Sequence, residues 1–119
     1  MKVFDPTLAV LERSLDVRLS KQNALAADLA NADTPGFKPL DVDFDKAMKA
    51  AVQDLDEPAA PAPATETAGS VEAGLDGNGV DRDKTLVSLA SNALQYGASA
   101  RAAGKKLAIL RYVATDGNG

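Results

Sequence analysis

The sequence contains no cysteine and no histidine among its 119 residues. The absence of cysteine excludes disulfides, thiol catalysis and cysteine-ligated metal sites. The absence of histidine removes the commonest general base and the commonest metal ligand. An enzyme with this composition would have to work with carboxylates, lysines and hydroxyls alone, so an enzymatic role is not expected.

Aromatic residues are also scarce. They make up 4% of the chain, tryptophan is absent, and much of the 45% apolar fraction is alanine. Alanine favours helix but contributes little buried area. A chain of this length is one small domain, near the lower end of what buries a sizeable core. We therefore expect helices that complete their packing in an assembly.

Long apolar runs and a strong charge of one sign are missing as well. No run approaches the roughly 20 residues of a membrane span, and no charged-then-apolar signal peptide opens the chain. The net charge of −4 divides into −8 over residues 41–83 and +4 over residues 84–119. An acidic middle repels nucleic acid, and the basic residues are too few for a strong phosphate-binding face. We expect no nucleic-acid binding.

The first regular pattern covers residues 7–32. Pro6 stands where a first helical turn tolerates proline, and Asp5 or Thr7 can cap the helix. Leucines recur mostly at three- and four-residue spacing, which predicts an amphipathic helix with one packing stripe. The stripe consists of Leu8, Leu11, Leu15, Leu19, Leu25 and Leu29, with Gln22 between them.

The middle of the chain predicts a shorter helix and a linker. Residues 44–55 repeat apolar side chains at helical spacing, and Asp43 can cap them. Residues 56–74 are rich in proline, alanine and acid, which is typical of a disordered or extended linker. Gly77 and Gly79 then indicate a turn.

The longest periodic segment runs from residue 81 or 82 to about residue 114. Asp81 is suited to cap it, and Asp83 suits the positive end of its dipole. Its apolar positions fit four heptads without a break. These packing positions are Leu86, Leu89, Ala93, Tyr96, Ala100, Ala103, Leu107 and Leu110.

A second stripe on this helix consists of small residues, Ala90, Gly97, Gly104 and Ala108. An interior glycine costs roughly 1 kcal/mol relative to alanine, so two of them on one face favour a tightly packed neighbour. The alternative is a chance occurrence on a tolerant helix. Nearer the C-terminus, Lys105, Lys106 and Arg111 complement the helix dipole; the alternative is that they meet the acidic middle of a neighbouring copy.

These elements predict an all-α fold. Two long terminal helices with coiled-coil-like pairing are joined by a partly flexible middle segment that holds a short helix. The regions are residues 1–34 with the first helix, residues 35–80 with the turn, short helix and acidic linker, and residues 81–119 with the heptad helix and tail. The long helices can pair with each other as an antiparallel hairpin, or pack against other chains.

The acidic motifs do not complete a metal site. Asp41, Asp43 and Asp45 lack the glycine and the distal glutamate of a calcium loop. In the DGNG motif of residues 76–79, an EF-hand frame places Gly74 and Thr85 where carboxylates are required. A glycine-rich phosphate loop is also missing. We expect no metal, no cofactor and no small-molecule substrate.

A hard stop follows the first helix at DTPG, residues 33–36. Pro35 fixes φ and moves Thr34 out of the α region. Pro35 and Gly36 fit the central positions of a type II turn, in which glycine supplies the positive φ. Asn31 and Asp33 can bond to local backbone groups. We expect Phe37, just beyond the turn, to pin it to a helix.

As a whole, this stretch resembles a family signature. Ala30, Asn31, Thr34, Pro35, Gly36 and Phe37 match the Ala-Asn-x-x-Thr-Pro-Gly-Tyr/Phe pattern of flagellar axial proteins of the rod and hook class. With Asp33 and the following DVDF, the pattern is most similar to the proximal-rod family, FlgB. DGNGVDRDK resembles that family's element before the last helix. The last helix resembles its C-terminal helix at Leu94, Tyr96, Lys106, Leu110 and Arg111. Asp28 stands where the family often has asparagine.

The resemblance implies a non-catalytic structural subunit of the bacterial flagellar basal-body proximal rod. It implies export through the flagellar type III apparatus without signal cleavage, and assembly in the periplasm through the terminal helices. Implied partners are copies of itself, other rod subunits, and membrane-proximal adaptor and export-gate proteins. The alternatives are another flagellar rod subunit, or a soluble helical adaptor or chaperone that binds a partner helix.

Overall fold

The computed structural model describes residues 5–58, 62, 65–66 and 80–115. The chain forms helix α1 (Pro6–Ala30), strand β1 (Leu40–Asp41), helix α2 (Phe44–Ala51), strand β2 (Thr65–Glu66) and helix α3 (Arg82–Ala114). The helical fold class with two long terminal helices is confirmed, with a two-stranded ribbon added. The turn expected at Gly77 and Gly79, most of the linker and the C-terminal tail lie outside the described residues.

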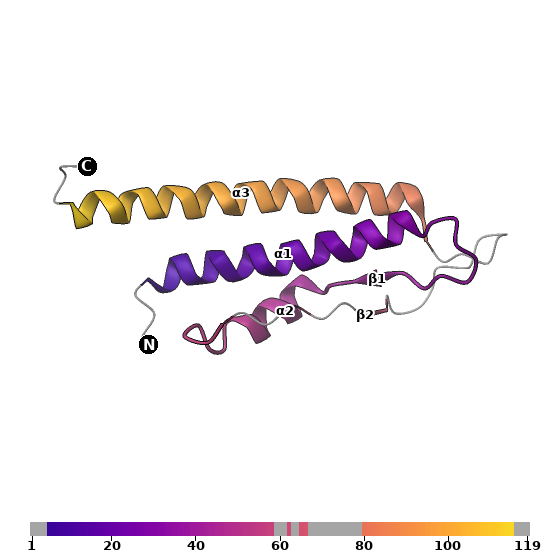
Figure 1. The fold of residues 1–119 in the computed structure, drawn as a ribbon, viewed down its shortest axis with the longest axis horizontal. Helices are drawn as coiled ribbons and strands as arrows, with labels where there is room; N and C mark the ends of the chain where they lie inside the picture. Colours follow the sequence, from indigo (N-terminus) through magenta and orange to yellow (C-terminus); the bar gives the residue numbers. More distant parts are fainter. Residues whose placement is uncertain (1–4, 59–61, 63–64, 67–79, 116–119) are drawn as a thin grey trace.

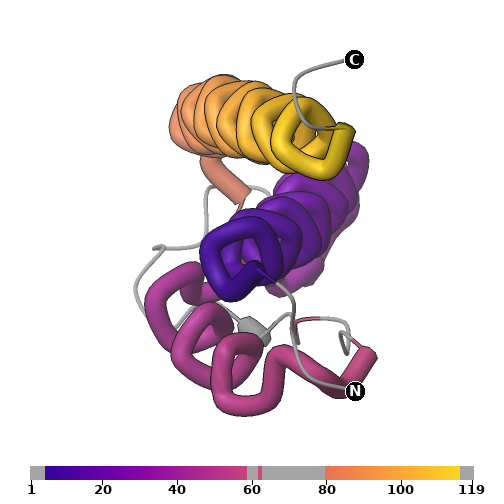
Figure 2. Tube along the Cα trace, turned by 90° about the vertical axis from the view of Figure 1, so that its left-hand side faces the viewer, coloured from indigo at the N-terminus to yellow at the C-terminus, as the bar shows by residue number. Residues whose placement is uncertain are grey.

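The helices are arranged in layers around α1. α1 and α3 run antiparallel along the long axis, and α2 and the two strands lie on the other side of α1 (Figure 1). The end-on view shows α1 between α3 and α2 (Figure 2). α1 is therefore the element that packs on two sides. In the part of the chain that the structure describes, neither long helix is apolar enough to cross a membrane.

Each helix begins directly after an aspartate, because the carboxylate accepts a bond from an orphan backbone N–H of the first turn. Pro6 occupies the first helical position, as expected. The caps expected at Asp43 and Asp81 are thus confirmed, and of the two candidates for the first helix, Asp5 and Thr7, the cap is Asp5. The bonds run from Leu8 N to Asp5 Oδ1 (3.1 Å), from Lys46 N to Asp43 Oδ1 (3.1 Å) and from Lys84 N to Asp81 Oδ1 (3.0 Å).

Helix α2 is shorter than expected, since it ends at Ala51 instead of residue 55. The backbone N–H of Asp56 donates to Asp54 Oδ1 (3.1 Å), a local bond that competes with helix. The Arg13 guanidinium donates to the backbone carbonyls of Asp54 (3.3 Å) and Glu57. These carbonyls are therefore drawn towards α1 and do not continue α2.

The contact between α1 and the α2 layer is apolar. Val17, Ala24 and Val42 form its buried centre, and six partly buried apolar residues pack around it. The residues that surround this centre are Leu40, Phe44, Ala47, Met48, Ala51 and Ala62. The strands add an antiparallel ribbon with Leu40 opposite Glu66 and Asp41 opposite Thr65. A residue of the expected linker thus contributes to the core.

The contact between α1 and α3 carries a polar network. Asn92 is 2% exposed, and its Nδ2 donates to Arg18 O and to Gln22 Oε1, both at 2.8 Å. Arg18 also bonds to Gln95. Ion pairs hold both ends, Asp5 with Lys106 (3.5 Å) and Asp33 with Arg82. These contacts fix the antiparallel register of the hairpin.

Candidate assembly surfaces

The stop after α1 is the turn that the sequence predicts. Phe37 N donates to Thr34 O (3.2 Å), and this bond encloses Pro35 and Gly36. Gly36 has a φ of +74°, the value that a type II turn requires of its third residue. A Cβ added to Gly36 would meet nothing within 4 Å. Glycine is thus required here by backbone conformation and not by crowding.

Asn31 makes several of the hydrogen bonds that hold this turn. Its Nδ2 donates to Ala27 O (2.8 Å), its Oδ1 accepts from Thr34 Oγ1 (3.2 Å), and its carbonyl accepts from Thr34 N (2.9 Å). Asp33 differs from the expectation of a local backbone bond, because its carboxylate forms an ion pair with Arg82 at the start of α3. The turn is therefore linked to the hairpin partner. Phe37 is half-buried.

Asp28 is a buried residue that the sequence pattern did not single out for packing. It is 3% exposed, and its Oδ1 accepts a bond of 2.7 Å from Leu40 N. Burial raises the pKa of Asp28; the Leu40 N–H opposes this, and the nearby Asp41 carboxylate adds to it. Asp28 therefore joins the end of α1 to β1. The position lies off the leucine stripe, so the apolar spacing gave no signal for its burial.

The neighbouring carboxylates serve structural roles. Asp41 Oδ1 contacts Lys21 Nζ (2.8 Å), which also donates to Val42 O (3.0 Å). Asp43 caps α2. Among the described residues, no group of three or more acidic side chains is arranged to hold a metal ion. The DVDF segment thus anchors β1 and α2 to α1.

The leucine stripe of α1 is distributed over several environments. Leu25 is buried, whereas Leu19 is 50% exposed. Leu8, Leu11, Leu15 and Leu29 are half-buried. The buried positions also include the adjoining residues Arg13, Ser14, Val17, Ala24 and Asp28. The stripe alone did not indicate them, because α1 packs against neighbours on two sides and not on one.

The heptad positions of α3 are only partly covered within one chain. Leu89, Ala100, Ala103 and Leu110 are half-buried, whereas Leu86, Ala93, Tyr96 and Leu107 are exposed. Asn92, which the apolar pattern missed, is the most buried residue of the helix. Gly97 is half-buried and Gly104 exposed. A Cβ on Gly104 would meet nothing within 4 Å, and one on Gly97 would meet the side chain of its helical neighbour Arg101. No tight neighbour within the described chain explains these glycines.

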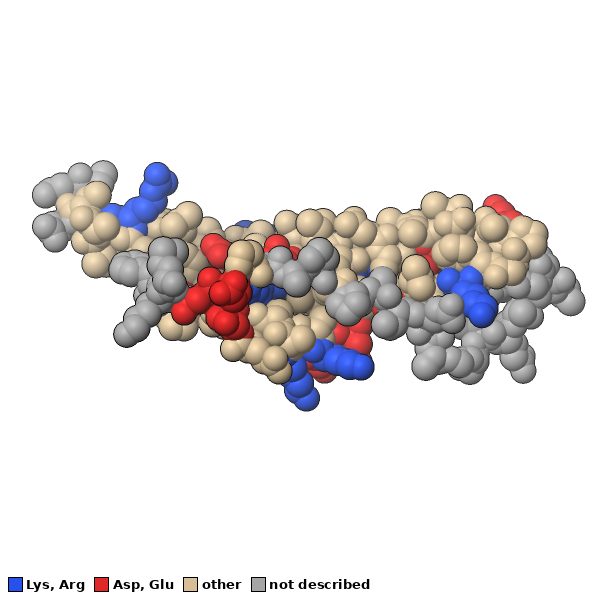
Figure 3. Space-filling model, turned by 60° about the horizontal axis from the view of Figure 1, so that its bottom comes forward, with Lys and Arg blue, Asp and Glu red and all other residues tan. Residues whose placement is uncertain are grey.

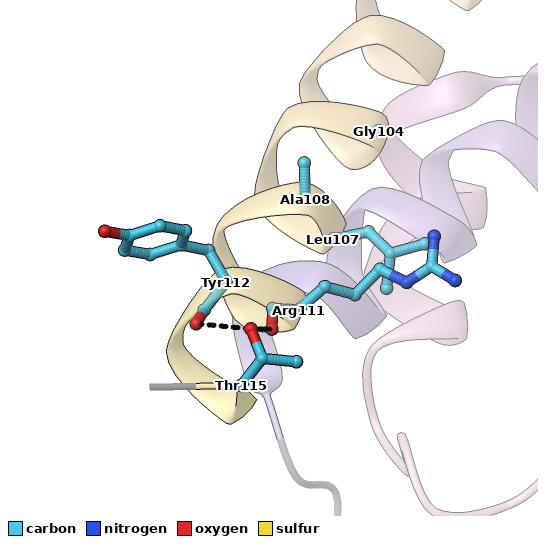
Figure 4. Close-up of a pocket in the computed structure, with 6 residues that line it drawn as sticks. All are labelled: Gly104, Leu107, Ala108, Arg111, Tyr112 and Thr115. Carbon is cyan, nitrogen blue, oxygen red and sulfur yellow. Dashed lines mark hydrogen bonds between the residues drawn. The ribbon is translucent and has the colours of Figure 1, made fainter. Parts of the chain in front are cut away.

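The C-terminal part of α3 carries a groove that is lined by residues of this helix and its C-cap. Figure 4 shows Tyr112 on one side and Leu107 and Arg111 on the other, with the small Ala108 between them. Thr115 closes the helix by donating to the carbonyls of Arg111 and Tyr112, both at 3.1 Å. The lining residues are Gly104, Leu107, Ala108, Arg111, Tyr112 and Thr115. The groove therefore presents an apolar surface next to the Arg111 guanidinium.

The chain is similar over nearly its whole length to proteins called flagellar basal body rod protein FlgB. It is 30% identical to that of Escherichia coli (strain K12) over 134 aligned positions, which cover 97% of this chain and 97% of the relative. It is 29% identical to that of Salmonella typhimurium over the same shares. It is 47% identical to that of Proteus mirabilis over 38 residues, which cover 32% of this chain and 27% of the relative. No family model matches the sequence.

Proposed function

Because this chain belongs to the FlgB family of flagellar basal body rod proteins, we propose that it is a structural subunit of the proximal rod that assembles through its two terminal helices. The full-length similarity to rod proteins supports the first part. The exposed side chains of α3 support the second part.

Helix α3 carries most of the large apolar side chains that the described structure leaves exposed. A helix that has all its partners hides such residues, and contiguous exposed apolar surface marks interaction sites. The exposed large residues on α3 are Leu86, Val87, Leu94, Tyr96, Leu107, Ile109, Tyr112 and Val113. α3 is therefore suited to be covered by other subunits, which is the single observation that carries assembly through the helices.

The partners follow from this role. Copies of the chain and other rod subunits would cover the helices, and membrane-proximal adaptor and export-gate proteins would lie below them. Export through the flagellar type III apparatus without a cleaved signal would deliver the chain to the periplasmic rod. A catalytic role is not part of the proposal.

The proposal is tested by deleting the coding region. We expect loss of the rod in isolated basal bodies and loss of swimming, both restored by the wild-type chain. A deletion strain that swims and builds normal basal bodies would contradict the proposal.

The turn provides a finer test. Gly36→Val should reduce rod assembly, because a β-branched residue strongly disfavours a φ of +74°. Gly36→Asn is the matched control, since asparagine tolerates this conformation and should support near-normal swimming. Rods and swimming that are equally good in both variants would show that the turn conformation is not needed for assembly.

A further inference from the structure

The charged side chains of α1 are sorted by sign, and the structure describes this whole helix. Its three basic residues point into contacts: Arg13 with the carbonyls after α2, Arg18 with the Phe44 ring (3.9 Å to the centroid), and Lys21 with Asp41. Its exposed charged residues are Glu12 and Asp16, both acidic. The free edge of α1 is therefore negative.

The body of α3 has the opposite sign. Residues 85–114 contain four basic side chains and no acidic one. Arg101, Lys105 and Arg111 are exposed, whereas Lys106 is half-buried and bound to Asp5. Nothing within residues 85–114 neutralises this charge. The free surface of α3 is therefore positive along its C-terminal half.

Both surfaces also carry apolar and small residues suited to helix packing. On α1, Leu19 is half exposed, and Ala26 and Ala27 are exposed beside the two acids. On α3, Leu94 is 72% exposed and Val87 69% exposed. We call the first set, Glu12, Asp16, Leu19, Ala26 and Ala27, the α1 edge. We call the second set, Val87, Ala90, Leu94, Arg101 and Lys105, the α3 outer face.

The register of the hairpin places the complementary residues at matching heights. Asp5 lies level with Lys106, and Gln22 lies level with Asn92, as their contacts show. With equal rise per residue along both helices, Glu12 lies level with Arg101 to within about one residue. By the same count, Leu19 lies level with Leu94, and Ala26 with Val87, to within about one residue.

We propose that the α1 edge of one copy docks on the α3 outer face of a second copy in the same register as the hairpin within one chain, with Glu12 paired to Arg101 and Leu19 packed on Leu94. The inference rests on the proposed function, because it specifies how rod subunits meet side by side. Charge complementarity, coincident with apolar positions at equal heights, is what identifies the occupant as this chain.

The contact joins two different surfaces, so it is heterologous. Such a contact repeats around an axis and forms either a closed ring or an open helical array. The small Ala90 and Ala26 allow the helices to approach closely. The contact therefore builds a rod layer without a second type of interface between equal copies.

The chain has no cysteine of its own, so introduced thiols test the contact in cells. One strain produces both Leu19→Cys and Leu94→Cys chains, and two control strains produce one variant each. Because the periplasm is oxidising, thiols brought within disulfide distance join there. We expect a disulfide-linked dimer from basal bodies of the mixed strain and none from either control strain.

The other outcomes contradict the proposal. A dimer in a single-variant strain would indicate a two-fold symmetric contact, and a motile mixed strain without the dimer would indicate a different occupant of the α3 outer face. A control strain that produces Lys49→Cys, exposed on α2, together with Leu94→Cys should give no linked dimer. If the Leu19→Cys and Leu94→Cys pair prevents motility, the pair Ala26→Cys and Val87→Cys tests the same contact with the same expected dimer. Absence of the dimer in swimming cells would overturn this contact but leave the rod function intact.

A charge exchange gives an independent readout. Glu12→Arg and Arg101→Glu each place like charges together and should lose swimming, because like charges across an interface are strongly unfavourable. The double variant restores the pair with opposite polarity and should recover swimming. Single variants that swim normally, or a double variant no better than the singles, would overturn the pairing.

Discussion

The two faces of α1 are built from different chemistry. Towards α2 and the strands, apolar side chains close around Val17, Ala24 and Val42. Towards α3, half-buried apolar positions of both helices meet, and a buried asparagine network and terminal ion pairs add polar contacts. Apolar burial supplies most of the free energy of folding, whereas buried polar groups add little net stability. We infer that the polar network on the α3 side contributes more to register than to stability.

Within the described part of the chain, two buried polar atoms in the α1–α3 contact, Asn92 Oδ1 and Arg18 Nε, lack a hydrogen-bond partner. Burial also lowers the pKa of Arg18. A single polar residue between paired helices specifies register at a cost in stability. The α1–α3 contact thus suits a subunit whose last helix gains further partners. On the α2 side, which Figure 3 brings forward, acidic and basic groups lie beside one another at several places.

The largest effect should come from the apolar face. Phe44→Ala removes an aromatic ring that packs on the core and lies over the Arg18 guanidinium. We expect a loss of about 3 kcal/mol in the free energy of unfolding, measured by chemical denaturation of the purified chain. Val52→Ala, at an exposed position just after α2, is the control and should change it by less than about 0.5 kcal/mol. Equal effects of the two variants would remove the distinction between core and surface.

Asp28 tests the link between α1 and β1. Asp28→Ala should cost about 1–3 kcal/mol in the free energy of unfolding, because it leaves the Leu40 N–H without its acceptor. Asp28→Asn keeps the acceptor and removes the buried charge, so it should be at least as stable as the wild type at pH 7. Denaturation midpoints of the three proteins, compared at pH 7, measure the difference.

The pH dependence has a definite sign. The pKa of Asp28 is higher in the folded chain than in the unfolded one, so its contribution to stability is present below the unfolded pKa and is lost as the pH rises through the folded pKa. The advantage of Asp28→Asn over the wild type should therefore shrink on acidification. An advantage that grows in acid would contradict burial as the dominant cause of the shift.

Asn92 tests the polar face. Asn92→Ala removes the donor to Arg18 O and Gln22 Oε1, and we expect a loss of about 1 kcal/mol in the free energy of unfolding. In this variant the backbone amide hydrogens of α3 should also exchange faster than those of α1, because α3 loses the contact that fixes its register. Ser91→Ala, at the exposed neighbouring position, should change neither quantity. A loss as large as that of Phe44→Ala would place the main core between α1 and α3.

The smallest effect should come from the ion pair at the open end of the hairpin. Lys106→Gln breaks the contact with Asp5 and should lower the free energy of unfolding only slightly, by an amount that decreases with added salt. The Leu8 N–H and Lys106 together hold the pKa of Asp5 below its ordinary value. Lys105→Gln, the exposed neighbour, is the control. Salt-independent destabilisation by Lys106→Gln would indicate packing by its side chain and not charge.

Most of the helical content followed from short-range rules. The capping aspartates, the proline at the start of α1 and the glycine turn are set by residues within four positions of each other. The shorter α2 did not follow, since the carbonyls after it turn to Arg13, more than forty positions earlier. The β1–β2 ribbon likewise joins residues on either side of α2 and the start of the linker, a pairing that local pattern does not reveal.

The sequence by itself determined where the helices begin and where the chain turns, because caps, proline and positive φ act locally. Its signature residues also determined the family. Only the tertiary structure decided which sides of the helices are covered, that Asp28 and Asn92 are buried, and that the basic residues of α1 point inward while its acidic residues stay exposed. Those features depend on contacts such as that of Asn92 with Arg18, 74 positions apart, and a helical period is the same whichever neighbour the chain brings against it.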